Sequence, residues 1–251
     1  MADTPTPGSK KPDPDAIIQA TGRLTGLVAQ QMPRNIPPGR AHWDYYAPAM
    51  ISRMLDLVES VRALMQADRA VDGAVLVRVL YEHVVKFCWI SIDPTTNYDR
   101  WREDARRWDT KLMNDAIGLG VAPGAVADAN QFNQLPDIAQ QADQIERHWG
   151  AKIAEFPGPT TGPQVLVTFR GMYLPVYRSG SEPVHARPEI LDAYNDRGSN
   201  LWQMGPGAGS KTLFWPLIVP LFAWALLVCN EQWDWPDRGQ VVAANNGMYA
   251  H

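Results

Sequence analysis

The chain has 251 residues, a formal net charge of −4, 45% hydrophobic residues and 20% charged residues. This composition is ordinary for a folded globular protein, and the negative charge argues against a protein that coats nucleic acid through its overall field. The length allows one large core, so we predict a single domain. Both cysteines, Cys88 and Cys229, lie in apolar runs and are expected to be reduced packing residues.

The first fifteen residues, MADTPTPGSKKPDPD, are rich in proline and carry no large apolar side chain beyond Met1. Such a segment cannot contribute to a core, so residues 1–15 are expected to form a disordered leader. It does not have the basic and apolar regions of a secretory signal, which predicts a cytoplasmic protein. We assign residues 16–236 to a helical domain and residues 237–251 to a polar C-terminal tail.

Apolar residues recur at helical spacing through the domain, which predicts an all-α fold, a helical bundle of about six helices. The clearest patterns cover residues 16–31, 42–65, 74–92, 98–116 and 136–156. Residues 164–177 combine strand-like and helix-like features, and we interpret them as a helix because no partner strand is visible. A short helix is expected at residues 189–196. Either Asp93 or Thr95 can cap the helix at residues 98–116.

Residues 74–92, AVLVRVLYEHVVKFCWISI, form the predicted central helix, because they are apolar on nearly every side. Three charged residues, Arg78, Glu82 and Lys86, fall within about 80° of the helix circumference. A buried charge needs a partner. Arg78 and Glu82 should therefore pair with each other or face a polar cleft supplied by another segment.

Residues 213–229, LFWPLIVPLFAWALLVC, carry no charge and are almost wholly apolar. The run only just reaches the about 17 to 25 residues needed to cross a bilayer. Pro216 and Pro220 also interrupt it. A buried helix packed beside the central helix is the better account, and association with a membrane is the alternative.

The predicted helix at residues 98–116 carries one apolar face, with Tyr98, Trp101, Ala105, Trp108 and Leu112 at helical spacing. Acidic and basic residues are mixed around its other side, which is typical of a solvated, ion-paired surface. Arginines interleaved with tryptophans offer an alternative, because they can hold the phosphates and bases of RNA or DNA.

Residues 205–212, GPGAGSKT, are similar to a phosphate-binding P-loop but have Ser210 where that motif requires its second glycine. No apolar strand leads into the segment. We expect a plain loop, and we expect the protein to use neither a cofactor nor a metal.

A second polar segment follows at residues 177–190, YRSGSEPVHARPEI, where Arg178, Ser181 and His185 are closely spaced. With Arg78 and Glu82, these residues make the chain resemble the HEPN superfamily of helical bacterial proteins. The likeness is to a branch of uncharacterised proteins with an Arg-x-x-x-Glu helix and a later Tyr-Arg…Ser…His segment. It covers residues 42–229.

The resemblance implies a helical homodimer that acts on RNA, as a metal-independent endoribonuclease of a toxin or phage-defence system. It places the arginine and histidine of the motif at the dimer cleft. This chain departs from the pattern at Ser179, since Asn, Asp or His usually follows the motif arginine. Gly180 and Pro183 also interrupt the helix expected there.

Ribonuclease chemistry needs a base for the 2′-hydroxyl proton, an acid for the leaving oxygen and a cation over the phosphate. His185 can be the base or acid and Arg178 the phosphate clamp, while Arg78 and Glu82 orient them or act as a second acid/base pair. In the alternative, these polar groups together with Ser181 form a satisfied structural network. The protein would then be a non-catalytic scaffold that binds a nucleotide or a protein partner.

Overall fold

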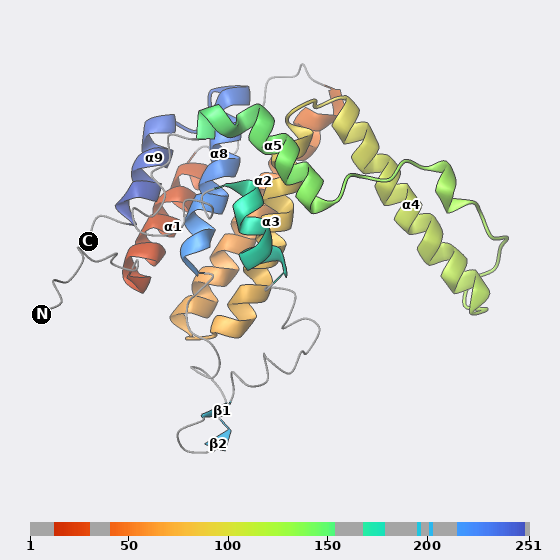
Figure 1. The fold of residues 1–251 in the computed structure, drawn as a ribbon, viewed down its shortest axis with the longest axis horizontal. Coiled ribbons are helices and arrows are strands. Elements are labelled where there is room, and N and C mark those ends of the chain that lie inside the picture. The colour runs from red at the N-terminus through yellow and green to blue at the C-terminus, as the bar shows by residue number, and fades with distance from the viewer. Residues whose placement is uncertain are drawn as a thin grey trace, which may run out of the picture.

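The computed structural model describes residues 13–30, 41–153, 168–178, 195–196, 201–202 and 215–248. Within these ranges the chain is a helical bundle, which confirms the predicted single all-α domain (Figure 1). Its longer helices are α1 (Pro14–Ala29), α2 (Ala41–Gln66), α3 (Ala70–Ile90), α4 (Thr96–Gly118), α5 (Ile138–Ile153), α8 (Ile218–Trp233) and α9 (Arg238–Gly247).

The described residues also form several short elements. These are the 3-10 helices η1 (Ala129–Gln131) and η6 (Trp215–Leu217), the helix α6 (Phe169–Met172) and the π-helix η3 (Tyr173–Arg178). Two strands of two residues each, β1 (Asn195–Asp196) and β2 (Leu201–Trp202), pair antiparallel.

Side chains fix where two of the helices begin. Asp13 accepts a hydrogen bond from the backbone N–H of Asp15, and Pro14 occupies the first turn of α1, where a missing N–H is harmless. At α5, Asp137 accepts from the N–H of Gln140, whose side chain accepts from the N–H of Asp137 in return. This reciprocal pair satisfies donors that a helix start leaves without partners.

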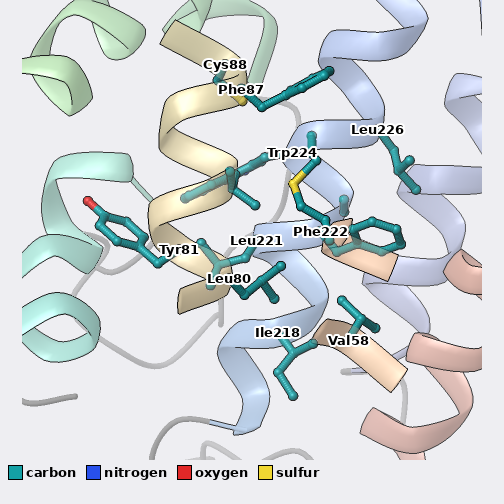
Figure 2. Close-up of a cluster of buried hydrophobic side chains, with 14 of the residues drawn as sticks. Val58, Leu80, Tyr81, Phe87, Cys88, Ile218, Leu221, Phe222, Trp224 and Leu226 are labelled. Atoms are coloured by element: carbon teal, nitrogen blue, oxygen red, sulfur yellow. The ribbon is translucent and has the colours of Figure 1, made fainter. Parts of the chain in front are cut away.

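Helix α3 is central, as predicted, and it contacts α2, α5, α8 and η3. The apolar run near the C-terminus packs beside it, also as predicted, and every residue of α8 from Ile218 to Cys229 is buried. Figure 2 shows side chains of α2, α3 and α8 meeting in this core, among them Val58, Leu80, Phe87, Leu221 and Phe222. Fully burying one such side chain stabilises the fold by about 1.5–3 kcal/mol.

Both cysteines lie in this core and neither forms a disulfide, as predicted. Burial raises the pKa of the Cys88 thiol and of the Cys229 thiol, because an apolar interior disfavours a thiolate. No helix of the described residues is long and apolar enough to cross a lipid bilayer.

Several predicted boundaries were wrong. The predicted leader of residues 1–15 includes Pro14 and Asp15, which belong to α1, and residues 1–12 lie outside the described residues. Asn195 and Asp196 form β1 rather than the end of a short helix. Residues 189–194 and the GPGAGSKT segment lie outside the described residues. The prediction for residues 164–177 holds where the structure describes them, from Phe169 onward.

The largest difference lies at the C-terminal end, where α9 follows the predicted limit of the helical domain at residue 236. Asp237 caps this helix by accepting from the N–H of Gln240. Val241, Ala244 and Asn245 are buried, and α9 packs against α1 and α8. Part of the predicted polar tail is therefore part of the core.

Candidate functional site

The charged stripe of α3 reaches the surface and is not wholly buried. The guanidinium of Arg78 and the carboxylate of Glu82 form an ion pair at 3.1 Å, with 20% and 35% of their side chains exposed. The predicted pairing is therefore present, but α3 is not closed to solvent along this stripe. The buried Nε of Arg78 has no hydrogen-bond partner within the part of the chain that the structure describes.

A second segment meets this stripe, because η3 packs against α3. The guanidinium carbon of Arg78 lies 5.0 Å from the centroid of the Tyr177 ring. Tyr177 stacks on Tyr173, with centroids 5.2 Å apart and an interplanar angle of 16°. The guanidinium of Arg170 lies 5.3 Å from the centroid of Tyr173. These four residues form a continuous column, which we call the Arg–Tyr stack.

The helical turns of α6 and η3 explain how this stack is built. Arg170, Tyr173 and Tyr177 follow one another at spacings of three and four residues, which places them on one side of a helical segment. The neighbouring residues Phe169, Met172 and Val176 are buried in the core. One side of the segment therefore anchors it while the other presents two arginines and two tyrosines.

A buried hydrogen bond fixes this segment on α3. The Tyr81 hydroxyl donates to the carbonyl oxygen of Phe169 at 2.7 Å. Phe169 also lies against Trp224 of α8, with ring centroids 4.2 Å apart. Burial raises the pKa of Tyr81, and the nearby carboxylate of Glu146 adds to this effect. Tyr81 is therefore a neutral phenol that donates this hydrogen bond.

Carboxylates surround the stack at both ends. Arg78 pairs with Glu82, and the Nε of Arg170 lies 3.6 Å from a carboxylate oxygen of Asp143. The backbone N–H of Arg170 donates to Glu146 at 2.7 Å. The carboxylates thus partly neutralise both guanidinium groups. The feature that these groups offer to a ligand is their planar faces rather than their net positive charge.

Lys86 lies on the same face of α3, two turns beyond Arg78. Desolvation lowers the pKa of Lys86 to about 8, against the opposing attraction of Asp104 and Glu82. Its Nζ lies 5.9 Å from the centroid of Trp89. A substantial fraction of this amine is neutral at slightly alkaline pH. The sequence placed Lys86 on the stripe but gave no sign of its altered protonation.

The predicted site residues fall into three groups. Arg78 and Glu82 lie together, and Tyr177, which precedes the motif arginine, contacts Arg78. The backbone of Arg178 ends η3, but its side chain lies outside the described residues. Ser181 and His185 also lie outside them. Tyr173 and Arg170 were missed, although their helical spacing from Tyr177 was a usable signal.

A polar hollow of about 940 Å³ lies between α4, α5 and the connection that precedes α5. It meets the Arg–Tyr stack at Asp143, which pairs with Arg170. Arg100 and Arg147 contribute positive charge to its wall, while Asp137 and Asp143 contribute negative charge. Gln144 lines it and accepts a hydrogen bond from the Trp89 indole N–H at 2.7 Å. The mixed charge does not select one ligand chemistry. Within the described ranges, no group of His, Cys, Asp and Glu side chains is arranged to hold a metal ion.

Comparison with known proteins adds one finding. No curated protein and no solved structure matches the chain. A family model matches residues 44–200, which is more than half of the chain and includes both α3 and η3. The protein therefore belongs to DUF5677, a family of unknown function.

Proposed function

We propose that the protein acts on RNA through the Arg–Tyr stack and the residues that follow it in the chain. The observation that carries this proposal is the column of two guanidinium groups and two phenol rings on α3, α6 and η3. Single-stranded RNA is bound largely by stacking of its splayed bases on aromatic rings and arginine planes. Such stacking depends less on net positive charge than phosphate binding does.

The chemistry that we propose is metal-independent endonucleolytic cleavage. Arg178 directly follows Tyr177 in the chain and would be the phosphate clamp. His185 would take the 2′-hydroxyl proton or protonate the leaving oxygen, and Ser181 would assist in the same segment. Arg78 and Glu82 would orient these groups. A homodimer, a cytoplasmic location and a role in a toxin or phage-defence system belong to the same proposal.

Binding is tested by titrating a fluorescent single-stranded RNA with the wild-type chain and with Tyr177→Leu and Arg170→Met variants. Loss of one stacking partner typically costs about 1–3 kcal/mol, so the dissociation constant should rise by about 5- to 150-fold. Arg69→Met is the matched control. Arg69 and Arg170 are both ion-paired and have 48% and 47% of their side chains exposed, but Arg69 lies outside the stack. Equal weakening by both arginine variants would contradict a stacking site.

Cleavage is tested by incubating mixed RNA with purified protein in EDTA, beside His185→Ala and Arg178→Ala variants. Removing a general acid or base lowers a rate by about 10²–10⁴-fold. Cleavage by the wild-type chain that both substitutions abolish would support the ribonuclease. RNA binding without cleavage would leave the action on RNA standing but remove the enzymatic step.

A non-catalytic scaffold is the second candidate. It is favoured by the carboxylates that already pair with both arginines of the stack, since most buried or half-buried polar groups satisfy one another. In this case the stack is a structural joint, and the polar face binds a nucleotide or a protein partner. Unaltered affinity for RNA in the Tyr177→Leu and Arg170→Met variants would favour this candidate.

A further inference from the structure

Helix α4 carries its apolar side chains on a surface exposed to solvent. Figure 1 shows this helix extending away from the rest of the bundle. Trp101, Ala105, Trp108 and Leu112 fall within an arc of about 60° at 100° per residue. The side chains of Trp108 and Leu112 are 61% and 71% exposed, and Leu119 just beyond the helix is 80% exposed. We call Trp101, Ala105, Trp108 and Leu112 the α4 stripe.

The α4 stripe begins at the core but soon leaves it. Tyr98, one turn before Trp101, is buried, and Trp101 is half-buried beside Tyr46 with ring centroids 6.3 Å apart. Beyond Trp101 the stripe no longer packs against the core, although apolar residues continue at helical spacing. A surface of several large apolar side chains on a protruding helix is typical of an interaction site rather than of a monomer's ordinary surface.

The connection after α4 folds back along the helix without covering the stripe. Asn114 exchanges two hydrogen bonds with the backbone of Ala127, at 2.7 and 2.9 Å. Asn133 donates to Glu103, and the N–H of Leu135 donates to Asp104 at 3.4 Å. Asn114 and Glu103 lie on the side of α4 opposite the stripe, about 150–170° from its centre. The chain therefore covers the polar side of α4 as far as Asp104 and leaves the apolar stripe exposed.

We propose that a second copy of this chain covers the α4 stripe by pairing with it as an antiparallel helix. Spacings of four, three and four residues along the stripe follow the heptad pattern of a coiled coil. In an antiparallel register, Ala105 faces the partner's Trp108, and Leu112 faces the partner's Trp101. Each of these contacts occurs twice around the two-fold axis. The small Ala105 leaves room for the bulky indole, so the two copies of the stripe are complementary in shape.

The charges that flank the stripe agree with this register. In an antiparallel coiled coil, like heptad positions flanking the core face each other across the axis. The same register opposes Asp104 with the partner's Lys111 and Arg102 with the partner's Asp109. All four flanking residues thus meet a charge of opposite sign. The charges on α4 therefore complement those of the same helix in the opposite direction. An unrelated partner would not require this match, so it favours a second copy of the chain.

Other exposed apolar groups are placed to extend the contact. Antiparallel pairing brings the end of one α4 to the beginning of the other. Leu119 and Val121, which are 80% and 78% exposed, would then approach the base of the partner's helix. Tyr45 lies at that base, 78% exposed and 5.2 Å from Tyr46 between ring centroids. The inference deepens the homodimer of the proposed function by naming its surface, and it rests on these contacts rather than on the action on RNA.

The first test measures the mass of the full chain in solution by sedimentation or light scattering. We expect a dimer at about 10–100 μM, and we expect Leu112→Glu to be monomeric there, with its dissociation constant raised more than about tenfold. Met113→Glu is the matched control, since it places the same charge one residue later on a 54% exposed side chain outside the stripe. A monomeric wild-type chain, or a Leu112→Glu variant that dimerises as the wild type does, would overturn the proposal.

The second test uses charge reversal and leaves the apolar residues intact. Arg102→Asp places two aspartates opposite each other at each flank, and Asp109→Arg places two arginines there. Each variant alone should dimerise at least about tenfold more weakly, because opposed like charges are unfavourable. An equimolar mixture should form a heterodimer with affinity near that of the wild type, since every flank then has opposite charges. Failure of the mixture to recover affinity would exclude this antiparallel register.

Discussion

The guanidinium carbon of Arg78 lies 5.0 Å from the centroid of the Tyr177 ring, and this contact joins α3 to η3. Both groups are only partly exposed, which strengthens a cation–π interaction because less water competes for the cation. In a double-mutant cycle of Arg78→Met and Tyr177→Leu, we expect a coupling of about 0.5–2 kcal/mol in the free energy of unfolding.

The matched cycle pairs Tyr177→Leu with Arg69→Met, whose guanidinium belongs to an exposed ion pair with Asp72. Arg69 pairs with Asp72 and lies outside the Arg–Tyr stack, so these two changes should add within about 0.3–0.5 kcal/mol. Chemical denaturation at one pH and ionic strength gives all of these values. Additivity in the Arg78 cycle as well would mean that the contact contributes nothing to stability.

Tyr81 should be required for holding the segment that carries the stack. Its hydroxyl donates to the Phe169 carbonyl in the core, and Tyr81→Phe leaves that oxygen without this donor. We expect a loss of about 1–3 kcal/mol and faster amide exchange in residues 169–178. Tyr45→Phe, at a 78% exposed ring, should change stability by less than about 0.5 kcal/mol. Equal effects from the two substitutions would contradict the assigned role.

Lys86 should make the stability of the fold depend on pH. Its pKa is about 8 in the folded chain and 10.5 as the reference for the unfolded chain. Between these values the unfolded state binds more protons, so stability should rise as pH increases from 8 to 10.5. Below pH 8 the full desolvation penalty is present. Lys86→Met should therefore stabilise the protein at pH 7 by up to about 3 kcal/mol.

This advantage of Lys86→Met over the wild type should decrease steadily above pH 8 and be smallest near pH 10.5. Comparing the two proteins at each pH removes contributions from the other titrating groups. Urea denaturation at pH 7, 8, 9 and 10 measures the difference. A difference that does not change with pH would show that the amine is not desolvated in the folded state.

The two cysteines should be unreactive in the folded protein. Both are buried, and burial raises the pKa of each thiol, so the nucleophilic thiolate is scarce and inaccessible. Labelling with a chromogenic disulfide reagent should proceed only as fast as the core opens. Two thiols should react rapidly in denaturant. Immediate labelling of either thiol under native conditions would contradict the packing between α3 and α8.

The sequence predicted the central part of this fold because its signals are strong there. The sequence runs that form α3 and α8 are apolar on nearly every side, and a helix of this kind is stable only when it is buried. The i,i+4 spacing of Arg78 and Glu82 predicted either an ion pair or a shared polar cleft, and the ion pair is present. Helix α9 was missed because RGQVVAANNG has few apolar residues and two glycines. Its burial depends on α1 and α8, which local periodicity does not reveal.

The candidate site was predicted only in part for a similar reason. The residues on α3 and in the segment after residue 177 were both identified, but contacts between distant segments are set by packing. Tyr173 and Arg170 lie at helical spacing from Tyr177, but that spacing alone did not show that the segment packs on α3. The α4 stripe shows the same limit, since helical spacing identified an apolar face and could not say what covers it.

Helix α1 packs against α9 and α8, the last two helices of the described chain. During synthesis α1 leaves the ribosome long before either of these partners exists. Its apolar side chains, such as Leu24 and Val28, are fully buried only in the finished fold. Until α8 and α9 emerge, α2 can cover part of α1, and the rest of its apolar surface stays exposed or is shielded by a chaperone. Folding of the complete core follows elongation and does not accompany it.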